Sequence, residues 1–145
     1  MCTSFKGQLL TATHNFGVAP TRGTTTADTF KAALYLASAT LNATTTAYSA
    51  TGEVTGTGYT AGGITVTNAT VPTTSGTTAY WTPSASLVYS SVTLSTAFDT
   101  VLIYNSTQSN AAVGVFTFGS QTVTAGTFTL TMPTNTAGTA LLNLA

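Results

Sequence analysis

The sequence predicts an all-β fold, either a single β-sandwich or a small barrel of short antiparallel strands, preceded by a short N-terminal helix and arm. Short segments of alternating apolar and polar residues recur along the chain, with turn signals between them at intervals near the expected 8–12 residues. Long helical patterns, which a parallel α/β sheet would require, are absent. The 145 residues suit one hydrophobic core. We therefore expect residues 1–27 to form the helix and arm, and residues 28–145 to form the β domain.

The N-terminal segment has the pattern of a short helix. Ser4 is a suitable N-cap, and Phe5 and Leu9 lie at helical spacing before His14, where the pattern stops. The following stretch, 18–26, is rich in threonine and is predicted to be either an arm that reaches a neighbouring subunit or a surface loop.

The period changes to two after Asp28. Apolar residues alternate over 30–36, which predicts the first strand, with Phe30 and Leu34 on the same face. A short helical turn is expected at 44–48. The glycine-dense segment 55–63 is expected to be a loop that leads into the next strand.

The second half of the chain predicts strands in quick succession. Pro83 ends one of them, and the segments around Ser90 form either two short strands or one bent strand with a bulge. The segment 105–110 is a hairpin loop between two strands that are apolar on both faces, so we expect this hairpin to be central. Two later strands are expected to pair with each other across Ala125 and Gly126. The predicted strands are 64–67, 78–82, 86–89, 91–94, 98–104, 112–118, 122–124, 127–132 and 139–144.

Charged residues make up only 4% of the chain, against about 25% in a typical soluble protein. The formal net charge is zero, and a weakly charged surface favours association because it loses water at little cost. Three basic residues are too few for a nucleic-acid interface, and no apolar run is long enough for a membrane span. The threonine-rich strand edges also lack the lysines that usually prevent pairing between chains. The charged residues are Lys6, Arg22, Asp28, Lys31, Glu53 and Asp99.

Few residues are available for chemistry. The chain has one His, one Cys and three carboxylates, no Gly-x-Ser-x-Gly motif and no His/Cys cluster at zinc spacing. We expect no enzymatic activity, no cofactor and no metal site, and we expect His14 to be a helix-end imidazole that donates a hydrogen bond to a loop carbonyl. The N-terminus lacks a secretory signal pattern, so the expected origin is a bacterial cytoplasm, with release by lysis.

The glycines of the loop invite comparison with nucleotide-binding loops. A dinucleotide fingerprint requires a helix after its glycines, whereas here a strand follows Gly62 and Gly63. We therefore interpret Gly56, Gly58, Gly62 and Gly63 as residues that turn a corner at positive φ or allow close approach of another chain.

Several segments resemble small proteins encoded in the structural gene clusters of tailed bacteriophages. The likeness extends from Phe5 and Lys6 to the final strand, and the segment 53–63 is its most specific part. The segments are 28–35 (DTFKAALY), 46–48 (TAY), 53–63 (EVTGTGYTAGG) and 102–105 (LIYN).

The resemblance implies a virion component at the capsid surface. The leading hypothesis is a capsid cement protein that bridges subunits of the major capsid protein and also contacts copies of itself, as a trimer. Glu53 is a candidate for the polar contact that sets subunit register. The expected contact residues are Phe5, Lys6, His14, Phe16 and Arg22 of the N-terminal region, together with Glu53, Gly56, Gly58, Tyr59, Gly62 and Gly63.

Two alternatives remain open from the sequence. The first is a tail or head-fibre subunit, or a host-recognition module, of the same virion. Tyr80, Trp81 and Tyr89 would then form a carbohydrate-binding face, although Trp81 is also well suited to the core of a sandwich. The second is a secreted adhesin domain.

Overall fold

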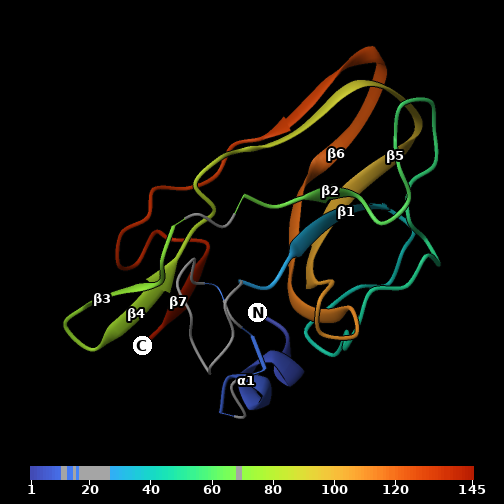
Figure 1. Cartoon of the computed structure of the whole chain (residues 1–145). Coiled ribbons are helices and arrows are strands. Elements are labelled where there is room, and N and C mark those ends of the chain that lie inside the picture. The colour runs from blue at the N-terminus through green and yellow to red at the C-terminus, as the bar shows by residue number, and fades with distance from the viewer. Residues whose placement is uncertain (11–12, 15, 17–26, 68–69) are drawn as a thin grey trace.

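The computed structural model describes residues 1–10, 13–14, 16, 27–67 and 70–145, without the side chains of residues 6, 7 and 10. The described part contains a short helix and two antiparallel sheets, with strand orders β2-β1-β5-β6 and β3-β4-β7 (Figure 1). The predicted all-β fold of antiparallel strands is therefore confirmed. The elements are α1 (Thr3–Leu10), β1 (Phe30–Leu36), β2 (Ile64–Thr65), β3 (Thr73–Ser75), β4 (Thr78–Trp81), β5 (Leu87–Asn105), β6 (Ala111–Leu130) and β7 (Leu142–Leu144).

Strand β1 is one of the two interior strands of the larger sheet, and it lies between β2 and β5. It pairs with β5 from Phe30 opposite Asn105 to Leu36 opposite Phe98, and it pairs with β2 on its other side. The alternation predicted for 30–36 is only partly present, because Tyr35 is buried as fully as Leu34. A strand covered on both faces buries both sets of side chains, which accounts for the continuous apolar run.

Strands β5 and β6 form one long hairpin. They have 19 and 20 residues. The loop predicted at 105–110 joins them, except that Asn105 is the last residue of β5. The expectation that 122–124 and 127–132 pair with each other is wrong: Val123 pairs with Leu94 of β5, and Phe128 pairs with Tyr89. Strand β5 is long enough to pair with both segments. Ala125, with φ of 46°, lies where the register shifts instead of at the tip of a hairpin.

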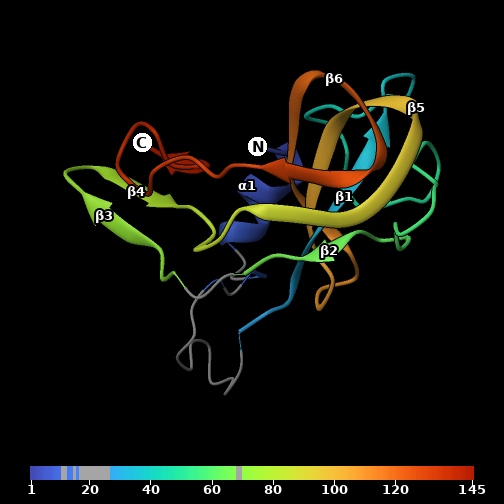
Figure 2. The ribbon, with the colours of Figure 1, turned by 90° about the horizontal axis from the view of Figure 1, so that it is seen from above.

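The β5–β6 hairpin is strongly curved. Figures 1 and 2 show both strands bending back over the molecule. The rings of Phe118 and Phe128 lie 5.5 Å apart, although ten residues of straight strand span about 33 Å. Phe98 fills the inside of the bend, 4.9 Å from Phe128. The hairpin is not central as expected, because β6 is the edge strand of its sheet.

The smaller sheet lies beside the helix (Figure 2). Strands β4 and β7 correspond to predicted strands, whereas β3 was missed because its three residues are all hydroxylated and carry no apolar signal. The helical turn expected at 44–48 is wrong. Thr46 accepts a hydrogen bond from Ala112 N, and Ala47 forms a bridge with Ala111, so this segment runs alongside the start of β6.

The predicted N-terminal helix is confirmed as α1. The backbone N–H of Cys2 donates to the carbonyl of Val113, and Phe5 is 1% exposed within the core. These contacts fix α1 against the first residues of β6. The predicted arm at 18–26, together with Arg22, lies outside the described residues.

Candidate interaction surface

Three of the contact residues expected in the N-terminal region meet in one aromatic cluster. Phe5, His14 and Phe16 are buried and pack against one another, and Phe16 also stacks on Phe30 at 4.3 Å. This cluster belongs to the core of the chain. The side chain of Lys6 and all of Arg22 lie outside the described part.

His14 joins this cluster to the larger sheet through hydrogen bonds. Asn105 Nδ2 donates to His14 Nδ1 at 3.1 Å, and His14 Nε2 donates to Gln8 Oε1 at 2.8 Å. The same amide nitrogen also donates to Asp28 Oδ2 at 2.8 Å. Asn105 is fully buried, so this network secures the N-terminal region to the end of β5. The sequence predicts donation from His14 to a loop carbonyl, whereas the structure shows Nε2 donating to the side-chain oxygen of Gln8, a residue of α1.

Glu53 organises the second group of expected contact residues. It is 7% exposed, and its carboxyl oxygens accept hydrogen bonds from Tyr48 Oη at 2.6 Å, Tyr59 Oη at 2.7 Å and the Gly62 backbone N–H at 2.7 Å. The Tyr59 hydroxyl also accepts from the backbone N–H of Leu34 at 3.0 Å. Glu53 therefore holds its own loop onto β1, with both carboxyl oxygens occupied inside the chain.

The loop glycines allow the loop to lie directly on the sheet. A Cβ on Gly56 would overlap the carbonyl oxygen of Thr93, and one on Gly63, where φ is +72°, would overlap that of Ala32. Gly58 approaches Ser91 in the same way. The close backbone approach predicted for these glycines is thus made to β1 and β5 of the same chain.

Burial raises the pKa of five tyrosines, and the neighbouring Glu53 carboxylate is a further cause for all five. For Tyr35, the pKa rises to about 12, chiefly through loss of water. Loss of water on burial is also the main cause of the raised pKa of Tyr48, Tyr59, Tyr89 and Tyr104.

We expect the free energy of unfolding to stay level up to about pH 9 and to fall between pH 10 and 12. A tyrosine with a raised folded pKa keeps its proton in the folded state, while the unfolded state releases it near pH 10, so alkali favours unfolding. Each fully buried tyrosine lowers the free energy of unfolding by up to about 1.4 kcal/mol per pH unit in this range. Urea denaturation at pH 8, 10 and 11 measures the effect. Tyr89→Phe should show a shallower fall, and a stability that is flat to pH 11 would contradict the prediction.

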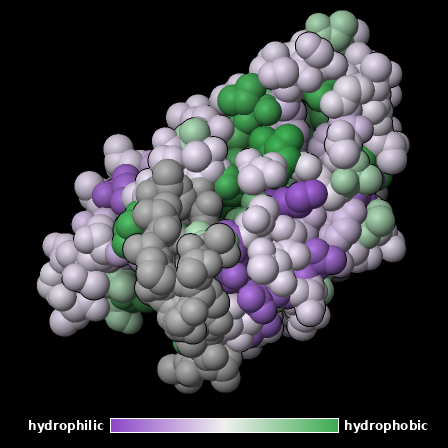
Figure 3. All heavy atoms as spheres, viewed as in Figure 1, coloured by the Kyte–Doolittle hydropathy of each residue, from purple (hydrophilic) through white to green (hydrophobic). Residues whose placement is uncertain are grey.

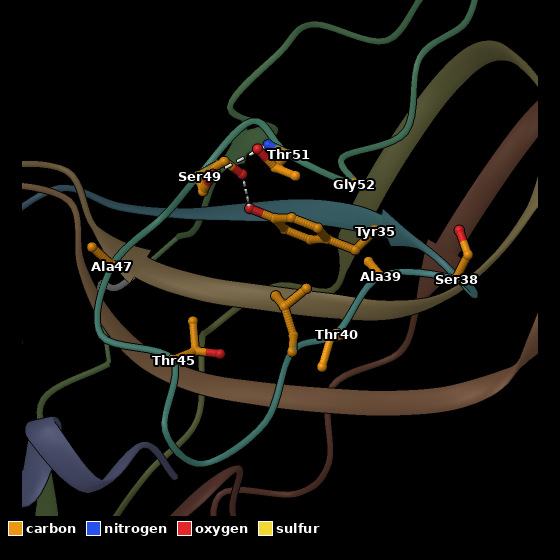
Figure 4. Close-up of a pocket in the computed structure, with 10 residues that line it drawn as sticks. Tyr35, Ser38, Ala39, Thr40, Thr45, Ala47, Ser49, Thr51 and Gly52 are labelled. Atoms are coloured by element: carbon orange, nitrogen blue, oxygen red, sulfur yellow. Dashed lines mark hydrogen bonds between the residues drawn. The ribbon is translucent and has the colours of Figure 1, made fainter.

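A pocket of about 420 Å³ lies beside the end of β1 and the loop that follows it (Figure 4). Tyr35 forms one wall, and its hydroxyl donates to the carbonyl of Ser49 at 2.5 Å. The other polar lining groups are the hydroxyls of Ser38, Thr40, Thr45, Ser49 and Thr51. This lining carries hydrogen-bonding hydroxyls but no charge.

The described surface has an unusual electrostatic character. Asp28 and Glu53 are buried, and Lys31 and Asp99 are half-buried, so none of the charged side chains that the structure describes is fully exposed. Most of the face seen in Figure 3 has the pale colour of residues that are neither strongly hydrophilic nor strongly hydrophobic. The sequence also carries no charged residue after Asp99, a run of 46 uncharged residues that includes β6 and β7.

The carbohydrate-binding face suggested by the sequence is not formed. Trp81 and Tyr89 are each 2% exposed, so both lie in the core, and Tyr80 is the remaining accessible member of the three. Trp81 Nε1 donates to the carbonyl of Thr70 at 2.8 Å, which satisfies its polar atom inside the chain.

Within the described residues, no three His, Cys, Asp or Glu side chains come together as a set that could hold a metal ion. No helix in that same part of the chain is long and apolar enough to cross a membrane.

Comparison of the chain with models of protein families, with curated proteins and with solved structures finds no match.

Proposed function

We propose that this chain is a structural subunit of a tailed-phage virion, in the role of a capsid cement protein. The observation that carries the proposal is the absence of a fully exposed charge among the described side chains. A monomer in water gains colloidal stability from exposed charge. A surface of hydroxyl, methyl and backbone groups instead suits burial against other protein.

An uncharged surface loses its water at a lower free-energy cost than a charged one. Moving an ion out of water without a partner costs several kcal/mol, so a charged surface resists being covered. The exposed residues of β6 are threonine, glycine, serine, glutamine and alanine, and none of them imposes that cost. The partners proposed are the major capsid protein and copies of this chain, and the resemblance to phage structural proteins supports the first of them.

The proposed mechanism is mechanical. Many copies lie across the joins between capsid subunits and bury surface that the pressure of packaged DNA would otherwise separate. Since binding favours the assembled shell over its dissociated parts, occupancy stabilises the head by mass action, and many modest interfaces together are sufficient.

We expect particles that carry this chain to contain it in hundreds of copies, and particles that lack it to release their DNA at a lower temperature. Copy number is measured by quantitative mass spectrometry against the major capsid protein, and DNA release by a dye during heating. Adding the purified chain back to deficient particles should restore the release temperature, whereas an unrelated uncharged β protein should not.

Copy number also separates the proposal from its main alternative. A handful of copies per particle would assign the chain to the tail or a head fibre and would overturn the cement role. Unchanged release temperature at full occupancy would likewise contradict the proposed mechanism.

A further inference from the structure

The outer edge of β6 is open along most of its length. The start of the strand is covered, since Ala112 N donates to Thr46 and Val113 O accepts from Cys2. From Phe116 to Leu130, β5 is the strand that pairs with β6 among the described residues, and it occupies one side only. In an antiparallel ladder, alternate residues of an edge strand direct N–H and C=O groups away from the sheet. This edge therefore presents backbone groups that another strand can pair with, although the carbonyl of Gly119 already accepts a hydrogen bond from Gln121 Nε2.

The edge carries neither the charge nor the proline that commonly prevents pairing with another chain, although register shifts interrupt its ladder with β5 between Thr117 and Phe128. Segment 111–130 contains no Lys, Arg, Asp, Glu or Pro, whereas monomeric proteins commonly place charge or proline on a long edge. Two identical strands can then lie side by side without repulsion between like charges.

The other sheet edges are too short to be its partner. Strand β2 has two residues, and β3 and β7 have three each. An edge of 15 residues can be paired along its full length only by another β6, among the strands that the structure describes. Such self-pairing is antiparallel and is related by a twofold axis.

The sequence of the open edge is nearly symmetric about Val123. Reading outward from Val123 in both directions along 116–130, threonines and aromatic residues recur at matching distances. An antiparallel pair centred there joins similar side chains, and aromatic and Thr–Thr pairs across strands are favourable. The matched positions are Thr122 with Thr124, Phe118 with Phe128, Thr117 with Thr129, and Phe116 with Leu130.

The curvature of β6 has the same symmetry. Phe118 and Phe128 lie five residues on either side of Val123, and their rings meet inside the bend. A twofold axis through Val123 that points into the bend maps a curved edge onto one of the same curvature. Two bent hairpins can therefore meet along the whole edge without straightening.

We propose that the chain forms a twofold dimer in which the β6 edges of two copies pair antiparallel about Val123. The two larger sheets then join into one continuous curved sheet. The pairing concerns the purified chain and goes beyond the proposed role in a particle, and it differs from the trimer expected under the cement hypothesis. Thr122 and Thr124 are exposed, so their substitution changes this edge and leaves the core intact.

The test uses two charged variants of the full chain. Sedimentation equilibrium should give wild type twice the mass of one chain. Thr122→Lys/Thr124→Lys and Thr122→Glu/Thr124→Glu should each dimerise at least tenfold more weakly, because each places like charges opposite one another. Mixing the two variants should restore a dimer of one copy of each. The matched control, Thr77→Lys, lies in the exposed turn between β3 and β4 and should dimerise as wild type does.

A second variant tests the register. Val123→Cys places a thiol opposite itself across the axis, at a Cα separation suited to a disulfide. It should cross-link under oxidised glutathione, whereas wild type should not, because its single Cys2 is buried.

The inference is overturned if wild type sediments as a monomer at 100 μM, if the lysine variant dimerises as tightly as Thr77→Lys, or if the mixture stays monomeric. A Val123→Cys variant that dimerises as wild type does but forms no cross-link would overturn the register. None of these outcomes bears on copy number in a particle, so failure of the dimer and failure of the cement role are distinguishable.

Discussion

Gly63→Ala is expected to destabilise the chain by about 4 kcal/mol, a large part of the 5–15 kcal/mol that holds a typical domain folded. Gly63 has φ of +72°, and an added Cβ would overlap the Ala32 carbonyl oxygen and press on Ala33 Cα. Both neighbours are backbone of β1, a strand held between β2 and β5, so they cannot move aside without breaking ladder hydrogen bonds.

Gly76→Ala separates steric overlap from backbone strain. Gly76 also has positive φ, at +58°, but nothing lies within 4 Å of the position of its Cβ. It should therefore lose only about 1 kcal/mol, the usual cost of a left-handed conformation for alanine. Urea denaturation of both variants measures the difference, and equal losses would show that the close approach of the loop to β1 contributes nothing.

Glu53→Ala is expected to cost about 3–5 kcal/mol, since it removes the acceptor for three donors. The hydroxyls of Tyr48 and Tyr59 and the N–H of Gly62 all depend on its carboxyl oxygens. With that acceptor absent, the loop is held to the sheet only by its remaining bonds, which include those from Leu34 N–H to Tyr59 Oη and from Tyr104 Oη to the Gly62 carbonyl. Faster hydrogen exchange at Gly62 should accompany the loss of stability.

Glu53→Gln is the matched control for this prediction. It keeps the shape and one acceptor oxygen, so it should lose only about 1–2 kcal/mol. If Glu53→Ala proved as stable as Glu53→Gln, the carboxyl group would not organise the loop.

The strongly patterned elements could be predicted from the sequence. The serine predicted as the N-cap, Ser4, lies inside helix α1, which begins at Thr3. The helix itself follows from Phe5 and Leu9 on one face, and β1 and β4 follow from apolar and aromatic runs that end at turns or at Pro83. These signals are local, and in these three elements the local propensity favours the same secondary structure as the tertiary contacts do. Strand β3 carries no such signal, because its residues Thr73, Thr74 and Ser75 are all exposed and polar.

Pairing could be predicted less well than the strands themselves. The segments on either side of Ala125 have the appearance of a hairpin, and the choice between a hairpin and one bent strand depends on β5, which lies far earlier in the chain. The sequence does not indicate the intrachain contacts of Glu53 for a similar reason. The scarcity of charged residues suggests a contact between subunits, whereas the three donors that the structure shows come from the loop of Glu53 and from Tyr48.

The open edge was foreseen only in general terms. Threonine-rich strands without lysine indicated unguarded edges, but which strand is an edge depends on sheet order. The uncharged run after Asp99 was the available signal that the edge would belong to the C-terminal half.

The order of strands in the larger sheet has a consequence during synthesis on the ribosome. Leu36, at the end of β1, pairs with Phe98, which is added to the chain 62 positions later. At about 5–20 residues per second, the nascent chain carries β1 without its longer partner β5 for about 3–12 s, long enough for chaperones to bind it. Of the strands that pair with β1, only the two-residue β2 is completed in that interval. Strands β5 and β6 need only the short turn between them, and local contacts form fastest. Folding of this sheet therefore begins in the part of the chain that is made last, and β1 docks onto a hairpin that is already formed.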